Sequence, residues 1–440
     1  RRQLPRLLAD RPVEVERLRA AGEGDDGTED AAGGSGEGHV EPYVNYFPAE
    51  EGAVVRVPDT TDALAGVQHG TMTVVVDQQG VPQQLRGTVL EIRDGRKKVV
   101  WKAAEAVVDR YPNPHPRIKV TWARLTERPS ENTPEAVIDA VVGEFPKAAA
   151  SAEQPVGGGA GVSVVGAVFE DGLRPYERGD AWLFAVRGWK APQQQSGRVR
   201  PSREEVGPYL ARAYRADRRA MTERVPSVDA LADKRVVVFG TGGVGAPLAL
   251  EFAKAGVGTL ILVDRDFADP GNACRWPLGF LVAGHRKTAV LVDFIRWHWP
   301  HTEVAMVAGA IGQPRTVGGG DAHGKAVHEC LDGADLVVDA TAEVGMSYFL
   351  SDATREAGVP LIVASATEGG WGGRVVCLGT DPDAPCWFCI EQHTLDGTLP
   401  TPPSDPDPET GSIHPGGCTT PTFTGTGFDI GTVSLGASVK

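Results

Sequence analysis

The chain has 440 residues, 41% of them hydrophobic, and a formal net charge of −14 at pH 7. This length predicts two or three domains with sizeable cores, and an acidic balance without a dense Lys/Arg run argues against nucleic acid and anionic membranes as partners. All six cysteines lie at or after Cys274, with no visible signal peptide or uninterrupted spanning segment, which predicts reduced thiols in the cytoplasm.

The first half of the chain carries no catalytic motif of its own. Residues 1–39 predict a charged helix and an acidic, glycine-rich flexible linker. Residues 40–190 predict a separate, mostly antiparallel α+β domain, because β-like runs and one helical stretch at 133–145 alternate with proline- and glycine-rich breaks. The β-like runs lie at 71–76, 84–92, 97–101, 118–122, 162–169 and 181–186. Residues 191–214 are predicted to form a polar linker and the first part of a helical arm, which runs from about residue 204 to about residue 223.

A strand, a glycine turn, a helix and a second strand follow the arm in that order. Gly240, Gly242 and Gly245 match the dinucleotide fingerprint, in which one glycine makes the turn, one lets backbone N–H groups approach phosphate, and one lets the helix pack on the strand. Gly256 is predicted as the left-handed stop of that helix. Asp264 ends the second strand at about the 20-residue spacing of an acid that accepts a ribose hydroxyl. These residues predict a nucleotide site, and they fit ATP and NAD equally.

Strands and helices alternate in the rest of the chain. Strands are predicted at 304–307, 336–340 and 360–364, and helices at 285–297 and 345–357. This alternation predicts a Rossmann-like, doubly wound and mostly parallel α/β sheet.

Polar residues after the second strand distinguish between the two nucleotides. Asp266, Asn272, Arg275 and Lys287 follow Asp264. Hydride transfer by a nicotinamide enzyme does not require an Asn, an Arg and a Lys close together after the ribose-binding acid. Nucleotidyl transfer needs them, because the triphosphate charge must be neutralised while pyrophosphate leaves.

The same residues carry a resemblance to a known family. The pattern Gly240-x-Gly-Gly243-x-Gly245, Asp264-x-Asp266, Asn272-x-x-Arg275 and Lys287 resembles the ThiF-type family of ubiquitin-activating-like adenylating enzymes, from about residue 215 to residue 440. The resemblance implies a homodimeric adenylyltransferase that binds ATP and Mg²⁺ and adenylates the C-terminal glycine of a ubiquitin-like or sulfur-carrier protein. It also implies that Asp264 holds the ribose, and that Asn272, Arg275 and Lys287 contact phosphates.

Further roles are carried over with departures from the family pattern. Family members commonly have an Asp-Asn pair after the fourth strand to hold magnesium, whereas this chain has Asp339-Ala-Thr-Ala342-Glu343. Asp339 is therefore the first candidate ligand, and Glu343 is the alternative.

The resemblance also bears on cysteines. Cys386-Trp-Phe-Cys389 resembles the first half of the family's zinc site, with no second pair visible; His393 and His414 are alternative ligands, and two ordinary reduced thiols are the other interpretation. Cys418 matches the cysteine that accepts the acyl group as a thioester, against the alternative of a buried residue at a helix start.

Two other assignments come from the likeness. Arg218 on the arm is the candidate for the arginine that family members insert into a neighbouring subunit's ATP site, although a solvated basic helix face explains it equally well. The 40–190 domain faintly resembles divergent conjugating-enzyme-like domains but contains no cysteine, which would make it noncatalytic. An NAD-dependent oxidoreductase and a degenerate nucleotide-binding scaffold remain the alternative functions.

Overall fold

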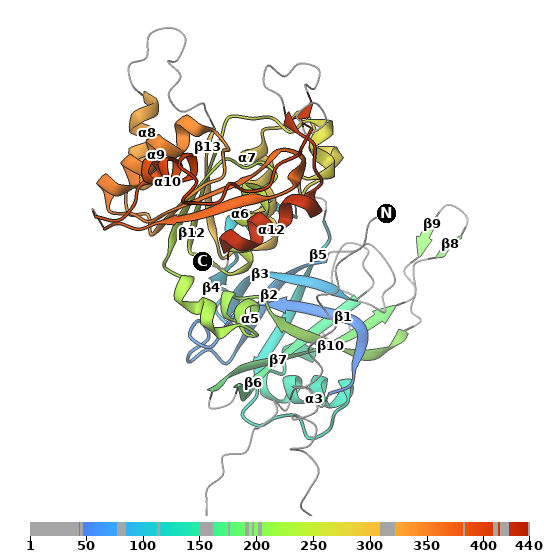
Figure 1. Ribbon diagram of the computed structural model, residues 1–440. Coiled ribbons are helices and arrows are strands. Elements are labelled where there is room, and N and C mark those ends of the chain that lie inside the picture. The colour runs from blue at the N-terminus through green and yellow to red at the C-terminus, as the bar shows by residue number, and fades with distance from the viewer. Residues whose placement is uncertain are drawn as a thin grey trace, which may run out of the picture.

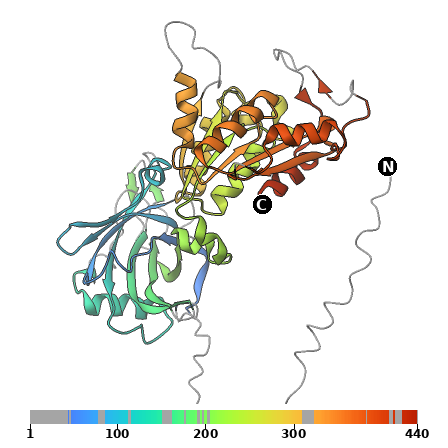
Figure 2. The same ribbon diagram turned by 60° about the vertical axis from the view of Figure 1, so that its left-hand side comes forward.

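The chain forms two adjoining units, a β-barrel and an α/β sheet, seen from two sides in Figures 1 and 2. A computed structural model describes them over residues 44, 47–76, 85–111, 115–149, 162–174, 177–189, 193–195, 198–200, 205–308, 322–381, 383–407, 412–413 and 422–438. The predicted helix and linker of residues 1–39 lie outside this part of the chain.

Seven strands close the N-terminal barrel. The order is β1-β10-β7-β6-β5-β2-β3, and a parallel pairing of β1 with β3 closes the ring, while β4 extends it beside β3. Neighbours are mostly antiparallel, as predicted, with parallel pairs at β1–β10, β1–β3 and β5–β6. The strands are β1 Ala49–Val57, β2 His69–Val76, β3 Arg86–Asp94, β4 Val99–Lys102, β5 Arg117–Arg124, β6 Val162–Arg174, β7 Glu177–Trp189 and β10 Glu205–Arg215.

Alternating apolar residues fill the barrel, because successive side chains of a strand point to opposite faces. Trp122, Trp182 and Phe184 are among its fully or almost fully buried residues. The outer face of β5, β6 and β7 buries a second apolar cluster under helix α3 (Pro134–Glu144), while α2 (Glu105–Asp109) lies near the outer side of β3. The predicted helix at 133–145 is therefore confirmed, with the Thr133 side chain accepting from the Ala136 N–H at its start.

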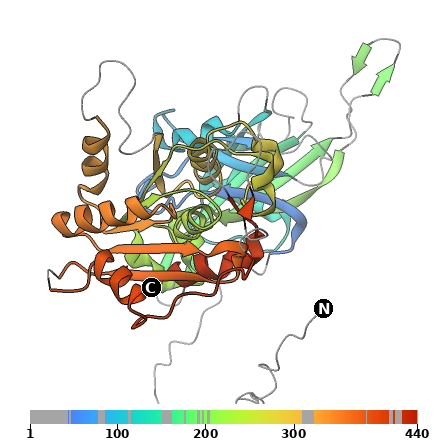
Figure 3. The same ribbon diagram turned by 45° about the horizontal axis from the view of Figure 1, so that its top comes forward.

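The helical arm predicted at 204–223 is wrong over most of its length. Residues Glu205–Arg215 form strand β10, which pairs with both β7 and β1, and only the short α5 (Arg218–Thr222) is helical. Leu210 faces the cluster under α3 while Ala211 faces the barrel interior, as successive residues of a strand do. Burial on both faces and pairing on both edges outweigh the local helical pattern. Strands β8 (Gln193–Gln195) and β9 (Arg198–Arg200) form a hairpin within the predicted linker, and this hairpin projects from the barrel (Figure 3).

The predicted separate α+β domain of residues 40–190 is corrected in two respects. Its strands close into a barrel that needs β10, from beyond residue 190, and the barrel contacts the second unit. Arg110 after α2 donates to the Trp297 carbonyl, and His301 Nε2 is bonded to the Ala216 carbonyl at 2.9 Å. The two units therefore adjoin through specific contacts.

The second unit is a six-stranded sheet in the order β13-β12-β11-β14-β15-β16. Its pairs are parallel, except that β16 runs antiparallel to β15. The strands are β11 Arg235–Phe239, β12 Thr259–Asp264, β13 Glu303–Ala308, β14 Leu336–Asp339, β15 Leu361–Ala366 and β16 Gly373–Leu378. The predicted Rossmann-like, mostly parallel sheet is confirmed.

Helices cover both faces of this sheet. One apolar cluster joins it to α6 (Gly245–Lys254), α7 (Lys287–His298) and α12 (Gly427–Ser438), and the other to α8 (Ala322–Leu331), α9 (Val344–Ala357) and α10 (Trp387–Leu395). Short elements are η2 Pro226–Leu231, η3 Pro270–Cys274, η4 Phe280–Val282, η5 Glu368–Gly370, β17 Ser412–Ile413 and β18 Thr422–Phe423. The strand order reverses between β11 and β14, so a ligand crevice is expected beyond the carboxyl ends of these two strands.

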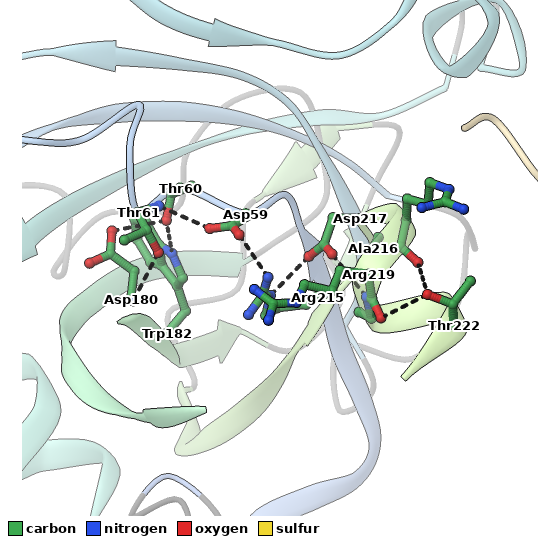
Figure 4. A network of polar contacts seen from close by, with 12 residues as sticks. Asp59, Thr60, Thr61, Asp180, Trp182, Arg215, Ala216, Asp217, Arg219 and Thr222 are labelled. Atoms are coloured by element: carbon green, nitrogen blue, oxygen red, sulfur yellow. Dashed lines mark hydrogen bonds and ion pairs between the residues drawn. The ribbon is translucent and has the colours of Figure 1, made fainter. Parts of the chain in front are cut away.

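A polar network joins the barrel to the start of the second unit (Figure 4). Arg215 at the end of β10 donates to Asp59 at 2.7 Å and to Asp217 at 2.8 Å. On the barrel side, the Trp182 indole donates to Thr60, whose hydroxyl donates to Asp180. Burial opposes ionisation of Asp59, but hydrogen bonds from Thr61 and the charges of Arg215 and Arg219 hold its pKa below the usual value.

No helix within the described residues is long and apolar enough to cross a lipid bilayer.

Candidate functional site

The glycine turn lies where β11 ends and α6 begins, beside the end of β14. Gly240 has a φ of 81°, and an added Cβ there would lie 2.6 Å from the Ala340 carbonyl oxygen. An added Cβ at Gly245 would lie 1.9 Å from the Gly240 carbonyl oxygen. Both positions therefore require glycine, one for the turn and one for the approach of α6 to β11, as the fingerprint predicts.

The two middle glycines of the turn differ from each other. An added Cβ at Gly243 would lie 2.5 Å from Cδ1 of Ile430 on α12 and 3.6 Å from Cδ of Arg275. An added Cβ at Gly242 would meet no atom within 4 Å. Packing against α12 therefore explains the glycine at 243, whereas the glycine at 242 faces open space, where a phosphate group would need close access to the backbone.

Asp264 at the end of β12 is held from the glycine turn. The Thr241 backbone N–H and hydroxyl both donate to Oδ2 of Asp264, at 2.6 Å and 2.8 Å. The Asp266 backbone N–H donates to Oδ1 at 2.8 Å. The partly exposed carboxylate is thus held in one orientation at the crevice, which suits a ribose acceptor.

Lys287 and Asp266 form the next pair along this edge. Nζ of Lys287, whose side chain is 11% exposed, lies 3.1 Å from Oδ2 of Asp266, and its backbone N–H donates to the Asp266 carbonyl at the start of α7. Arg265 reaches across the sheet end to Glu343 at 3.5 Å, so charged groups after β12 and β14 meet there. Because Lys287 is mostly buried, little water competes for its ammonium group, and its attraction to a bound anion would be correspondingly strong.

Arg275 and Asn272 lie on the η3 turn beside the glycines. The Arg275 side chain passes over Gly243, and the Trp276 indole donates to the Thr241 carbonyl at 2.8 Å. Oδ1 of Asn272 accepts from the Asp269 N–H in a capping box. The structure thus brings Arg275 to the glycine turn and gives the Asn272 oxygen a local structural role.

Asp339 ends β14 on the other side of the crevice. It is 1% exposed; its Oδ1 accepts from the Thr341 backbone and hydroxyl, and its Oδ2 accepts from the Ser347 hydroxyl at 2.6 Å. Ala342 has a φ of 56°, which an L-residue adopts at a cost. A metal at Asp339 has to reach an enclosed carboxylate that already accepts three hydrogen bonds, whereas Glu343 is 59% exposed. In the described part of the chain, no three His, Cys, Asp or Glu side chains gather as a metal site.

Cys386 and Cys389 lie at the start of α10 with their sulfur atoms 3.7 Å apart. Zinc–sulfur bonds of about 2.3 Å in a tetrahedron set sulfur atoms about 3.8 Å apart, so the pair fits one edge of such a site. The Cys389 backbone N–H, together with the Cys389 side chain and against the effect of burial, lowers the pKa of the Cys386 thiol. His393 is bonded to Thr398 instead of pointing at this pair.

Arg218 serves its own chain. Its guanidinium donates to the Gly256 carbonyl at 2.8 Å and to the Val228 carbonyl at 3.3 Å. Gly256 has the predicted left-handed φ, 74°, after α6. The role of Arg218 in a neighbouring subunit stays a prediction, and it requires these bonds to break. Cys418 and His414 lie outside the described residues.

Sequence reasoning missed Thr241, Trp276 and Ser347. Thr241 occupies a variable position of the glycine motif, and its role depends on contacts with residues far along the chain. The motif accepts any small residue at this position. The presence of a hydroxyl group there is therefore the one sequence signal that points to a further role for Thr241.

A mostly parallel sheet covered on both faces, with a glycine turn and two acids at its switch point, defines a Rossmann-type α/β protein. The ThiF family model matches residues 216–427, within the predicted 215–440. Protein y4qC of Sinorhizobium fredii is 30% identical over 403 residues, which are 90% of this chain and 67% of y4qC. The chain belongs to the ThiF family.

Two further proteins show how far the similarity extends. The SAMP-activating enzyme E1 of Haloferax volcanii is 31% identical over 172 residues, which are 39% of this chain and 58% of that protein. The crystal structure of E. coli MccB with ATP has 17% sequence identity and a TM-score of 0.35, covering 48% of this chain and 55% of that one. The chain thus spans little more than half the length of either.

Proposed function

We propose that this protein is an ATP-dependent adenylyltransferase that activates the C-terminal glycine carboxylate of a ubiquitin-like or sulfur-carrier protein. Membership of the ThiF family supports adenylyl transfer, as does the relative named SAMP-activating enzyme E1. The observation that carries the proposal is the placing of Asp264 and Arg275 at the glycine turn, with Lys287 bonded to Asp266 two residues after Asp264. A hydride-transfer enzyme needs the acid but neither cation.

The chemistry assigns a task to each group. A carboxylate oxygen of the partner attacks the α-phosphorus of ATP, the bond to the bridging oxygen breaks, and pyrophosphate leaves with the bonding electrons. Asp264 orients the ribose, backbone N–H groups at Gly242 approach phosphate, and Lys287 and Arg275 stabilise charge on the phosphates as pyrophosphate departs. Lys287 exchanges its contact with Asp266 for this anion.

The test is ATP–pyrophosphate exchange stimulated by a small protein that ends in glycine. Genes adjacent to the one for this chain are the first source of such a partner. We expect exchange with the intact tail and none when the terminal glycine is removed. Tight NAD binding without exchange would instead favour the oxidoreductase alternative, and ATP binding without exchange across a panel of partner tails would favour the scaffold alternative.

Magnesium is proposed to be held by Asp339, with Glu343 as the exposed alternative. Mg²⁺ keeps several waters and needs only one or two protein carboxylates when phosphates supply other oxygens. The proposal is tested by measuring the Mg²⁺ concentration that gives half-maximal exchange. Asp339→Asn raises it if Asp339 is the ligand, whereas a rise confined to Glu343→Gln transfers the role to Glu343.

A thioester at Cys418 is proposed as the second step. The Cys418 thiolate would attack the acyl adenylate, which releases AMP and leaves the partner joined through sulfur. Incubation with ATP and partner should yield a reductant-sensitive adduct. Its survival in Cys418→Ala refutes the assignment, and Cys274→Ala serves as the control.

We propose that the N-terminal barrel recruits or positions the partner, since the sequence places no cysteine in it. A homodimer is also proposed, with Arg218 as the arginine that acts in the neighbouring subunit. Sedimentation measures the oligomeric state. Mixing Arg218→Ala with a Lys287→Met chain tests complementation between subunits, because only a mixed dimer restores one complete site.

A further inference from the structure

Two threonine–aspartate pairs flank the crevice, one at the end of β12 and one at the end of β14. Thr241 donates through both its backbone N–H and its hydroxyl to Asp264, and Thr341 donates in the same way to Asp339. Asp339 is 1% exposed and also accepts from Ser347, whereas Asp264 is partly exposed. Of these two acids, Asp264 is therefore the one presented to a ligand.

Thr241 is itself held on its other side. Its side chain is fully buried, and its carbonyl accepts from the indole of Trp276, which is 4% exposed. Trp276 follows Arg275, whose side chain lies over Gly243. The peptide of Thr241 is thus fixed between the acid of β12 and the η3 turn, so that its hydroxyl meets Asp264 in one geometry.

This geometry decides which oxygen of Asp264 remains available. A carboxylate accepts about four hydrogen bonds, and the structure shows two at Oδ2, from Thr241, and one at Oδ1, from the Asp266 N–H. The remaining position lies on Oδ1. Without the Thr241 hydroxyl, one backbone N–H alone would hold Oδ2, and the carboxylate would be freer to turn.

We propose that Thr241 is a positioning residue that aims Oδ1 of Asp264 at a ribose hydroxyl and so makes the site selective for ribonucleotides. The inference rests on the proposed function, in which the nucleotide is ATP. Asp264 touches the nucleotide, and Thr241 acts through Asp264. Because a hydroxyl must donate to Oδ1, a sugar that lacks this hydroxyl leaves that acceptor position without the donor that ribose supplies.

The experiment measures equilibrium binding of ATP, 2′-deoxy-ATP and 3′-deoxy-ATP to the full chain by calorimetry, without partner. Loss of one hydrogen bond to a charged group is expected to weaken binding of one deoxynucleotide at least about tenfold in the unmodified protein. Thr241→Val, which keeps the shape but loses the hydroxyl, should bring this ratio close to one, and Thr241→Ser should restore it. Thr341→Val, the matched change on the β14 side, should keep the ratio.

The outcomes separate this inference from the proposed function. If Thr241→Val retains the unmodified ratio while Asp264→Ala abolishes it, the positioning role is wrong and the ribose role of Asp264 stands. If the unmodified protein does not discriminate among the three nucleotides, selectivity is overturned while ATP-dependent exchange can still be observed. Absence of ATP binding overturns both. If Thr241→Val fails to fold, Thr241→Ala gives the same readout.

Discussion

Cδ1 of Ile430 on α12 occupies the space that a side chain at Gly243 would need. The glycine turn and the C-terminal helix therefore fit together at this point, and Ser434 of α12 adds a hydrogen bond to the Val244 carbonyl. Gly243→Ala should lower the free energy of unfolding by about 1–3 kcal/mol through overpacking, measured by chemical denaturation. Ile430→Val removes the obstructing atom, so it costs about 0.5–1.5 kcal/mol alone but should offset part of the loss in the double variant. Strictly additive losses would contradict this account.

Gly242→Ala should act on binding instead of folding. An added methyl group there meets no protein atom within 4 Å, so the free energy of unfolding should barely change. The methyl group stands where phosphate approaches the backbone, and it should weaken ATP binding at least about tenfold, or 1.4 kcal/mol. Calorimetry with ATP checks this. Unchanged affinity would mean that phosphate lies elsewhere.

Lys287→Met should lower ATP–pyrophosphate exchange by at least about 100-fold, because a preorganised cation at the site of developing charge is lost. Folding should be little affected, since its partner Asp266 is half-exposed and can be hydrated. Lys254→Met on α6 is the matched control, because Lys254 pairs with Glu251 on the exposed surface. Equal activity of the two variants would remove Lys287 from the site.

The protein should lose stability as pH falls, in part through His301. Burial lowers the pKa of His301 in the folded protein, so below about pH 6.5 the unfolded chain binds more protons there. The contribution is present above this pH and is lost as pH falls through the folded-state pKa. His301→Gln keeps a donor for the Ala216 carbonyl but does not titrate. Urea denaturation between about pH 7.5 and pH 5 should give the variant a flatter profile.

Cobalt binding should report on the two thiols of α10. Their 3.7 Å separation suits a tetrahedral ion, so Co²⁺ should produce thiolate-to-metal charge-transfer absorption that Zn²⁺ then removes. Cys386→Ser should eliminate the band, whereas Cys377→Ser, at an exposed thiol on β16, should leave it. A band that persists in Cys386→Ser would place the metal elsewhere, and no band at all would favour two ordinary thiols.

Local patterns predicted the α/β unit well because each element there has its own periodic signal. Helix α6 and its stop at Gly256 follow from apolar spacing and one glycine, and β11 and β12 are short apolar runs. Local patterns wrongly predicted a helix where strand β10 lies, because the pairing of β10 with β7 and β1 involves residues distant in the sequence. Closure of the barrel by β1 and β3 likewise has no local signal.

The site shows the same division. Gly240, Gly245 and Asp264 follow from spacing, since the backbone geometry of the turn dictates them. The packing of Gly243 against Ile430 joins residues from distant parts of the sequence, so the motif alone predicted the glycine but not its reason. The family pattern points to Asp339 by its place after the fourth strand, but its enclosure by Thr341 and Ser347 depends on the start of α9, which the pattern does not specify.

Strand β10 pairs with β1 and β7 in the barrel and leads directly to Ala216, whose carbonyl is bonded to His301 of the α/β unit. The barrel is therefore attached to the α/β unit by side-chain contacts as well as by the connecting chain. If the barrel recruits the partner as proposed, a bound partner would approach the crevice from a fixed direction. The length of the partner's tail would then help to select the substrate. A carrier protein whose tail is too short to extend from the barrel to the crevice would not be modified, even if it ended in glycine.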